Sequence, residues 1–328
     1  MWNERFPAGS VLPLYISKYM SSIISVSRLS KQFKDIKAVD DLSFTVQEAD
    51  VYGFLGQNGA GKSTTIRMLL TLVKPSAGEI QIFGKELTHN RKAILTQVGA
   101  VIEKPDLYKF LSAYDNLAIF AKMSGLKPTQ SFLMKQLQLV GLDERAKSQV
   151  KTFSQGMKQR LGIAVALVHD PSLIILDEPT NGLDPQGIAD MRNLILNLSR
   201  EMGKTILVSS HLLSEIELIA NRMLIIHKGK KMVEGKVDEL LDPSKSLVNV
   251  HTTNDAAARE KIHQSRWGEF LQKGEVLQLK MSKEEVPQLI EDLVNMQVHI
   301  LSINPTHSLE EYFLSLTTHT GHVESFAD

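Results

Sequence analysis

The chain has 328 residues, 43% of them apolar, which suffices for one large domain and a small one. Its 37 basic and 37 acidic residues give a formal net charge of +0, so the composition does not indicate a nucleic-acid-binding protein. The absence of cysteine excludes disulfides, cysteine catalysis and thiolate metal sites, and it favours a cytosolic location.

The beginning of the chain shows no targeting or membrane signal. No apolar run approaches the roughly 20 residues that a membrane-spanning helix needs, and the run at 161–168 has the length of a core helix. Residues 1–19 have a short apolar centre and little positive charge before it, unlike a signal peptide. Met20 opens an alternating pattern typical of a strand. We interpret residues 1–19 as a disordered N-terminal extension or an artefact of the assigned start site.

Residues 51–64, VYGFLGQNGAGKST, connect a predicted strand to a predicted helix through a glycine-rich loop. The loop has the spacing G-x-x-x-x-G-K-S, which lets backbone N–H groups surround a phosphate at the positive end of a helix. Lys62 can then reach the β- and γ-phosphates, and the Ser63 hydroxyl can bind Mg²⁺. The alternative, a chance glycine-rich turn, is disfavoured by the flanking strand and helix. The residues predicted to hold the nucleotide are Gly56, Asn58, Gly59, Ala60, Gly61, Lys62, Ser63 and Thr64.

Residues 98–103, VGAVIE, form an apolar run that ends in a carboxylate directly before Lys104 and Pro105. Proline lacks a backbone N–H and pushes its predecessor out of the helical region, so we predict a buried strand ending at Glu103. The residues alone leave the role of Glu103 open, because a carboxylate at a strand tip can simply be solvated. Apolar residues at three- and four-residue spacing then predict a helical segment at about 104–165.

Residues 172–185, SLIILDEPTNGLDP, place two carboxylates at the end of a fully apolar strand. Open α/β sheets bind ligands at the carboxyl ends of such strands. We predict that Asp177 holds Mg²⁺, directly or through another ligand, and that Glu178 polarises an attacking water. The alternative is that the two carboxylates merely cap the strand.

A third apolar strand, TILVSS at 205–210, ends in His211 and is followed by an amphipathic stretch. A lone histidine at a strand end is more often structural than catalytic. Because this strand belongs to the same predicted nucleotide-binding sheet, we favour a contact between His211 and the γ-phosphate.

These pieces, in this order, resemble the ATP-binding cassette of an ABC transporter over roughly residues 22–240. The family places a signature sequence between the phosphate loop and Asp177, and this chain has FSQGMKQRLGIAVALVHDPS at 153–172. The resemblance implies that Ser154 and Gly156, at the start of a helix beginning near Met157, bind the γ-phosphate of ATP held by a partner cassette. The sequence departs from the common L-S-G-G-Q form but keeps the serine and the second glycine.

Other positions are carried over from the family in the same way. Phe33 matches the aromatic residue that stacks on adenine, although it could also be a core residue of an edge strand. Residues 181–184, ending at Asp184, match the loop that crosses the interface between two cassettes. Glu103 stands where most cassettes carry a glutamine that faces Mg²⁺ and the attacking water. Glutamate keeps the metal-facing oxygen, adds a charge and loses the amide donor, so we expect altered Mg²⁺ and pH dependence.

The resemblance implies the fold as well. Residues 20–242 are expected to form an α/β P-loop NTPase cassette, with a parallel-sheet core, an antiparallel β subdomain and a helical subdomain at about 104–165. A change of composition near Asp242 and Pro243 predicts a linker.

Residues 243–317 are predicted to form a small α+β domain of ferredoxin-like type. The expected elements are strand 247–252, helix 255–264, strands around GEFL and EVLQLKM, helix 284–295 and strand 298–303. Capping boxes are predicted at Ser282 with Glu285 and at Ser308 with Glu311. We predict a disordered tail at 318–328, in which His319 and His322 lie too close together for a metal site.

The implied function is ATP hydrolysis by the subunit of an exporter, with Lys62, Glu178 and His211 as catalytic residues and Asp177, Ser63 and Glu103 at the Mg²⁺. Two copies would pair around two ATP molecules at the cytoplasmic face of the cell membrane, bound to a separate multi-spanning permease, without nucleic acid. Glu103 and FSQGMKQRL together resemble the bacitracin-resistance and lantibiotic-immunity branch. The alternatives are a soluble cassette ATPase acting on ribosomes or DNA, and a weakly hydrolysing regulatory cassette. The transported compound and the pairing of identical or different cassettes stay open.

Overall fold

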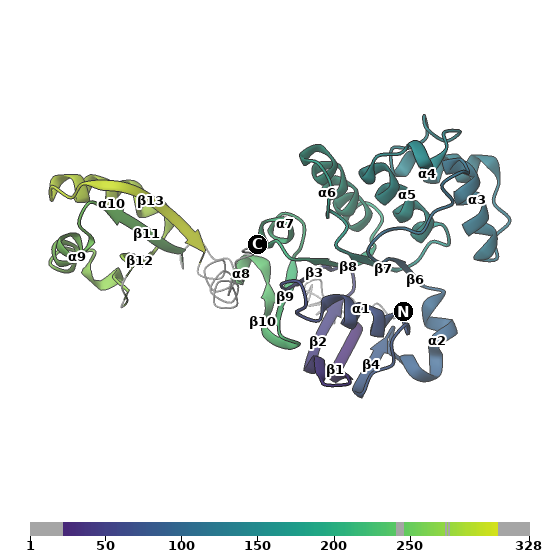
Figure 1. Cartoon of the computed structure of the whole chain (residues 1–328), viewed down its shortest axis with the longest axis horizontal. Helices are drawn as coiled ribbons and strands as arrows, with labels where there is room; N and C mark the ends of the chain where they lie inside the picture. The colour runs from purple at the N-terminus through teal and green to yellow at the C-terminus, as the bar shows by residue number, and fades with distance from the viewer. Residues whose placement is uncertain (1–21, 241–245, 273, 275, 308–328) are drawn as a thin grey trace, which may run out of the picture.

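The computed structural model of the chain describes residues 22–240, 246–272, 274 and 276–307, and Figure 1 shows its elements. These residues form three sheets, of four, six and three strands. None of the helices within the described ranges is long and apolar enough to cross a membrane. The predictions for residues 1–19 and 318–328, and the capping box at Ser308, lie outside the described residues.

The central sheet holds six strands in the order β10-β9-β3-β8-β7-β6. Its strands are parallel to one another except β10, which pairs antiparallel with β9. Every residue of β3, β7 and β8 is buried, as their largely apolar sequences predict for strands covered on both faces. The bounds are β3 (Val51–Leu55), β6 (Val98–Val101), β7 (Leu173–Asp177), β8 (Thr205–Ser210), β9 (Arg222–His227) and β10 (Lys230–Lys236).

Successive residues of the central strands point into two different cores. Ile174 and Leu176 face one core, whereas Leu173 and Ile175 face the other. The sheet therefore forms the middle layer, and its carboxyl edge carries the loops that follow β3, β7 and β8.

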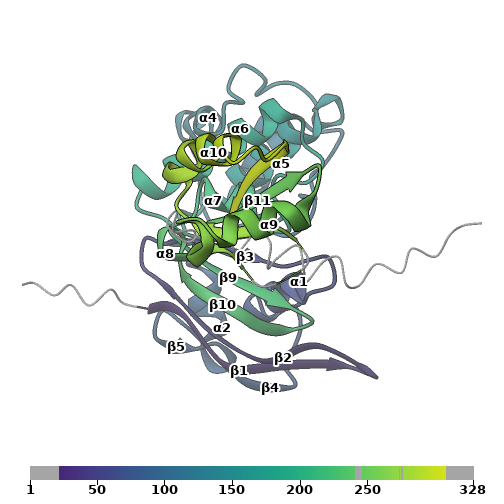
Figure 2. The same cartoon turned by 90° about the vertical axis from the view of Figure 1, so that its left-hand side faces the viewer.

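An antiparallel sheet, in the order β2-β1-β4-β5, lies below the central strands in Figure 2. Its residues share one core with α1 and the central sheet, and the rings of Phe44 and Phe54 lie 5.5 Å apart there. This layer confirms the predicted antiparallel β part. Its elements are β1 (Ser22–Phe33), β2 (Ile36–Gln47), β4 (Ala77–Ile82), β5 (Lys85–Glu86), α1 (Lys62–Leu69) and α2 (Leu87–Leu95).

Helices cover the other face of the central sheet, above it in Figure 1. Ser112, Thr129, Ser154 and Asp184 each cap a helix by accepting a backbone N–H bond, which explains where these helices begin. Three of these helices, at 113–123, 130–139 and 155–167, begin within the predicted helical segment at about 104–165. The bounds are α3 (Ala113–Met123), α4 (Gln130–Leu139), α5 (Gln155–Leu167), α6 (Pro185–Arg200), α7 (Leu213–Glu217) and α8 (Val237–Leu240).

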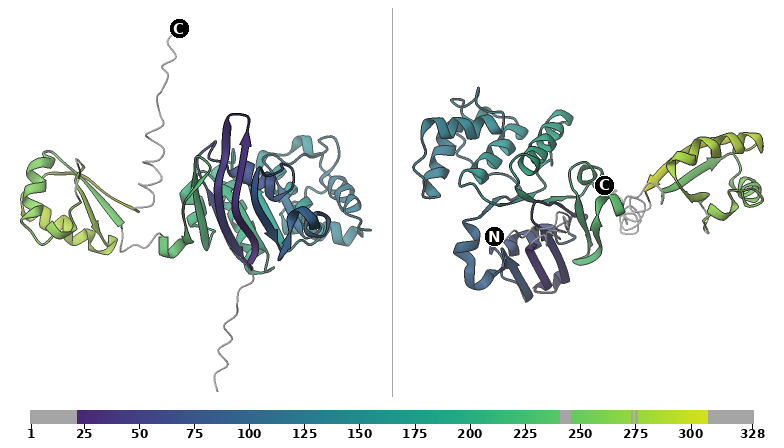
Figure 3. Two further views of the ribbon diagram at one scale, coloured as in Figure 1. Left: turned by 90° about the horizontal axis from the view of Figure 1, so that it is seen from below. Right: turned by 180° about the vertical axis from the view of Figure 1, so that it is seen from behind.

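The C-terminal unit is a three-stranded antiparallel sheet, in the order β12-β11-β13, with two α-helices, and it stands apart from the other sheets in Figure 3. Among the residues that the structure describes, its core contains members of this unit alone, between Val248 and Ile303. The predicted capping box of Ser282 and Glu285 is confirmed. The elements are β11 (Ser246–Thr252), α9 (Asp255–His263), β12 (Gln278–Met281), α10 (Val286–Asn295) and β13 (Ile300–His307).

Two predictions about strands were wrong. GEFL is not a strand, because Gly268–Phe270 form a 3₁₀ turn whose backbone groups bond to residues three positions away, and only Leu271 makes a single bridge to β12. The strand predicted to end at Glu103 ends at Val101. Glu103 has a φ of +55°, a left-handed turn conformation that cannot continue a strand.

Candidate active site

The glycine-rich loop lies between β3 and α1, which begins at Lys62. Gly59 and Gly61 have φ values of +82° and +107°, which only glycine adopts at no cost. A Cβ at Gly61 would also lie 2.5 Å from the carbonyl oxygen of Ala38. The loop thus bends into the N-terminal end of α1, where the peptide dipoles favour an anion.

Lys62 reaches across this loop toward the end of β7. Its side chain is only 4% exposed, and Nζ lies 3.0 Å from Oε1 of Glu178. The ammonium group also donates to the carbonyl oxygens of Gly56, at 2.6 Å, and Gln57, at 3.2 Å. A buried cation with these partners suits the binding of phosphate oxygens.

Asp177, the last residue of β7, is 1% exposed. Its Oδ1 accepts a hydrogen bond of 2.6 Å from the hydroxyl of Ser209. Among the residues that the structure describes, Oδ2 has no hydrogen-bond partner. A buried carboxylate oxygen without a partner is costly, and a hard cation such as Mg²⁺ would satisfy it.

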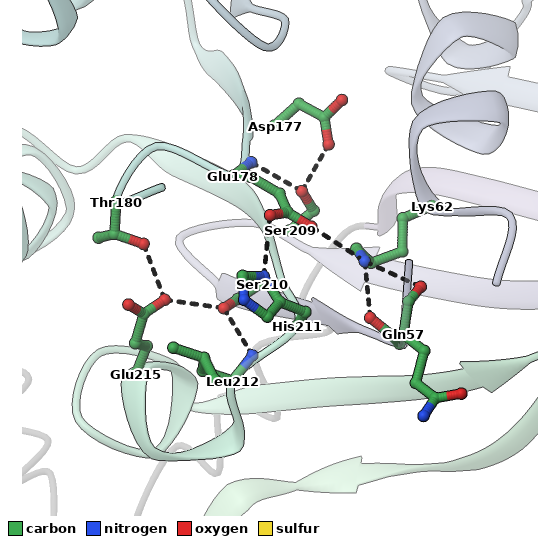
Figure 4. A network of polar contacts seen from close by, with 11 residues as sticks. Gln57, Lys62, Asp177, Glu178, Thr180, Ser209, Ser210, His211, Leu212 and Glu215 are labelled. Carbon is green, nitrogen blue, oxygen red and sulfur yellow. Dashed lines mark hydrogen bonds and ion pairs between the residues drawn. The ribbon is translucent and has the colours of Figure 1, made fainter. Parts of the chain in front are cut away.

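Glu178 and His211 face each other at the carboxyl ends of β7 and β8 (Figure 4). Oε2 of Glu178 lies 2.9 Å from Nδ1 of His211, while its other oxygen pairs with Lys62. The backbone N–H of Glu178 donates to the Ser209 hydroxyl at 2.9 Å. Lys62 and His211, which are both predicted to bind the γ-phosphate, therefore both contact Glu178, the predicted base.

An open groove collects residues from four segments: the glycine-rich loop, the loop after β6, the start of α5 and the turn after β7. The sequence predicted several of these residues, and the groove brings Asn58, Ser63, Glu103, Asp177 and Glu178 together. Its lining residues are Asn58, Ser63, Ile102, Glu103, Lys104, Gln155, Gln159, Asp177, Glu178, Asn181 and Gly182.

The other predicted site residues do not line this groove: Phe33, Lys62, Ser154, Gly156, Asp184, His211 and the loop residues Gly56, Gly59, Ala60, Gly61 and Thr64. Phe33 lies at the end of β1 and is 44% exposed, so it is not the core residue of the alternative interpretation. Ser154 and Asp184 are N-caps of α5 and α6, and Gly156 lies in the first turn of α5. Residues expected to act on the ATP of a partner cassette need not line the groove of their own chain.

Glu103 is held from two sides. Its Oε1 lies 2.5 Å from Nη2 of Arg67 in α1, and both side chains are substantially exposed, at 62% and 42%. Its backbone carbonyl accepts a 3.2 Å hydrogen bond from Nε2 of Gln159 in α5. The loop after β6 thus touches both the helix of the phosphate loop and the helix of the signature.

Sequence reasoning did not single out Ser209, Arg67 or Gln159. Ser209 offered a signal, because a hydroxyl inside a buried strand needs a partner and the candidate His211 follows closely. The sequence gives no signal for Arg67 or Gln159, because their contacts with Glu103 join positions that are 36 and 56 residues apart.

A family model described as ABC transporter matches residues 39–181. The uncharacterized ABC transporter ATP-binding protein YhcH of Bacillus subtilis is 43% identical over 305 residues, which cover 92% of this chain and 98% of that protein. The chain belongs to the ABC transporter ATP-binding proteins. As a member of this family it is an ATPase coupled to transport.

Other ABC transporter ATP-binding proteins are similar over much of the chain. The bacitracin transport ATP-binding protein BcrA of Bacillus licheniformis is 42% identical over 300 residues, covering 90% of this chain and 98% of BcrA. The lantibiotic transport ATP-binding protein SrtF of Streptococcus pyogenes is 41% identical over 216 residues, covering 66% and 92%. A solved ATP-binding subunit of an ABC transporter has a TM-score of 0.59 at 31% identity and covers 67% of this chain and 92% of its own.

Proposed function

We propose that this ABC ATPase energises the export of peptide antibiotics of the bacitracin or lantibiotic type through a separate permease. The match to BcrA carries this proposal, because it extends over 90% of the chain and therefore beyond the cassette. The name of SrtF points in the same direction for the cassette alone.

Each predicted site residue receives a role from its position. The glycine-rich loop and Lys62 bind the β- and γ-phosphates, and Phe33 stacks on the adenine ring at the end of β1. The arriving γ-phosphate draws Lys62 away from Oε1 of Glu178, which is then free to accept a proton from water while Oε2 keeps its contact with His211. Glu178 therefore stays paired with Lys62 until ATP binds.

Asp177 and Ser63 would hold Mg²⁺, with Glu103 at the same groove. The unpartnered Oδ2 of Asp177 is the observation that supports this assignment. When bound, the ion neutralises charge on the phosphate oxygens. Asp177 lines the groove, and the hydrogen bond from Ser209 orients it.

Two copies of the cassette complete two ATP sites in this proposal, with Ser154, Gly156 and Asp184 reaching the nucleotide of the partner. The helical segment at about 104–165 docks on the permease, which places the chain at the cytoplasmic face of the membrane. Residues 20–242 act as the cassette. Residues 243–317 support the dimer or regulate it, and their antiparallel pairing order is compatible with a ferredoxin-like sheet that has one strand reduced to a single bridge.

Replacing Glu178 by glutamine tests the assignment of the base. We expect ATP hydrolysis to fall by about 100-fold or more, because the amide cannot accept the proton from water. ATP binding should persist, since Lys62 and the loop remain. Steady-state hydrolysis and ATP binding by the purified full chain measure both, with the exposed Glu201→Gln as the control. A Glu178→Gln variant at the wild-type rate would contradict the assignment.

Capture from membranes tests the partner. The tagged chain is purified from native membranes in mild detergent, and a stoichiometric multi-spanning protein is the expected companion. Deletion of the gene should then raise sensitivity to bacitracin or a lantibiotic. Ribosomal or DNA-associated partners, with the chain absent from membranes, would instead support the soluble ATPase.

A further inference from the structure

Glu215 lies in α7, outside the nucleotide groove, yet it contacts both turns that carry the predicted catalytic pair (Figure 4). Its Oε2 accepts hydrogen bonds from the hydroxyls of Thr180, at 2.7 Å, and Ser210, at 2.8 Å. Thr180 follows Glu178 by two residues, and Ser210 directly precedes His211. A single carboxylate oxygen therefore joins the turn after β7 to the last residue of β8, directly before His211.

The turn around His211 is closed by a second bond of the same serine. The hydroxyl oxygen of Ser210 accepts the backbone N–H of Leu212 at 3.0 Å, so the bond spans the histidine. Fixing Ser210 to Glu215 thereby fixes the backbone on both sides of His211.

The turn that carries Glu178 needs support. Glu178 has a φ of +49°, a region sparsely populated by residues other than glycine, and such a conformation persists only where its surroundings hold it. Ser209 binds its N–H at 2.9 Å on one side. The bond from Thr180 to Glu215 secures the chain on the other side.

Glu215 is itself carried by a fixed element. The next residue, Ile216, is fully buried in the core below α7. A Cβ at Gly53 of β3 would lie 2.2 Å from Cγ2 of Ile216, so the helix is in direct contact with the central strand. The carboxylate position is thus set by the sheet that also carries Asp177.

We propose that Glu215 is a positioning residue that holds Glu178 and His211 at their 2.9 Å alignment through Thr180 and Ser210. This inference rests on the proposed function, because the alignment matters only if Glu178 activates water. Both hydroxyls donate to the same oxygen, so the acceptor matters more than the charge. Glutamine preserves an acceptor oxygen at this position, and leucine does not.

The test compares Glu215→Leu, Glu215→Gln and the exposed control Glu201→Leu with the wild-type full chain over a range of ATP concentrations. For Glu215→Leu we expect kcat to fall about 10- to 100-fold, with KM changed by less than about twofold, because binding groups remain while the base is misaligned. Glu215→Gln should recover most of the lost rate. A leucine variant within about twofold of the wild-type kcat, a loss in KM alone, or glutamine as slow as leucine would each overturn the proposal.

Thr180→Val and Ser210→Ala each remove one of the two hydrogen bonds to Glu215 and keep its carboxylate. Each should lower kcat, and neither should lower it further when combined with Glu215→Leu, because the same linkage is already lost. If thermal unfolding shows that Glu215→Leu does not fold, these single variants decide the matter, and unchanged rates in both would overturn the proposal.

Glu178→Gln in the same assay separates this inference from the proposed function. If Glu178→Gln keeps the wild-type rate, the assignment of the base fails and the positioning role fails with it. If Glu178→Gln abolishes hydrolysis while Glu215→Leu does not lower kcat, only the positioning role is wrong.

Discussion

At the scale of single residues, Glu103 adds a negative charge to the groove, and Arg67 partly neutralises it at 2.5 Å. Both side chains are exposed to water, so the pair contributes at most about 1 kcal/mol to stability. An ion pair this weak can break, so that Glu103 contacts a cation in the groove instead of Arg67. We therefore expect Glu103 to respond to a cation bound in the groove.

Glu103→Gln tests that response. We expect the Mg²⁺ concentration for half-maximal ATP hydrolysis to rise about two- to tenfold, because the site loses a negative charge near the cation. The control Arg67→Gln breaks the same ion pair but keeps the carboxylate, so it should not raise the requirement. Unchanged hydrolysis, Mg²⁺ requirement and transport in Glu103→Gln would instead support a merely solvated side chain.

At the scale of elements, α5 and the loop after β6 are in direct contact. A Cβ at Gly162 would lie 2.5 Å from Cβ of Pro105, and Gln159 bonds to the carbonyl of Glu103. The same loop touches α1 through Arg67, so it links the two helices that flank the groove.

Gly162→Ala should expose how tight this contact is. We expect the free energy of unfolding to fall by about 1–3 kcal/mol, because an extra methyl group must displace a rigid proline ring. Gly156→Ala in the same helix is the matched control, since its Cβ would meet Leu183 only at 3.8 Å. Urea unfolding of both variants provides the comparison, and a Gly162→Ala variant as stable as wild type would show that the contact yields.

At the scale of the whole molecule, the three hydrophobic cores divide the chain. One lies on each face of the central sheet, and the third, in the part of the chain that the structure describes, contains only residues of the C-terminal unit. A unit with its own core can be removed without opening another core.

A chain ending at Leu240 should accordingly keep the cassette folded. We expect one cooperative thermal transition, with a midpoint that rises when ATP is added, because binding stabilises only the folded form. A chain ending at Arg200 lacks the buried strand β8 and should fail to fold, which controls for truncation itself. Loss of the ATP-dependent shift in the chain ending at Leu240 would show that the C-terminal unit is needed for the cassette.

Much of the candidate site follows from local sequence. The strands before Gly56, Asp177 and His211 were predicted at their observed places, because continuous apolar runs give buried parallel strands. Topology then brings the carboxyl ends of such strands to one edge. The wrong strand at GEFL shows the limit of this reasoning, since four residues with mixed preferences left the outcome to local turn bonds and the packing of neighbouring residues.

The sequence by itself predicted which residues meet phosphate, because a glycine-rich loop between a strand and a helix has one geometry that suits an anion. It also determined the family, through motifs in a set order. Only the tertiary structure decided that Arg67 and Gln159 hold Glu103, that Ser209 orients Asp177, and that Glu215 bonds to Thr180 and Ser210 beside the predicted catalytic pair. Those contacts join positions far apart in the chain or depend on how a turn is folded. Short-range sequence patterns do not predict which polar groups will be buried together and form hydrogen bonds.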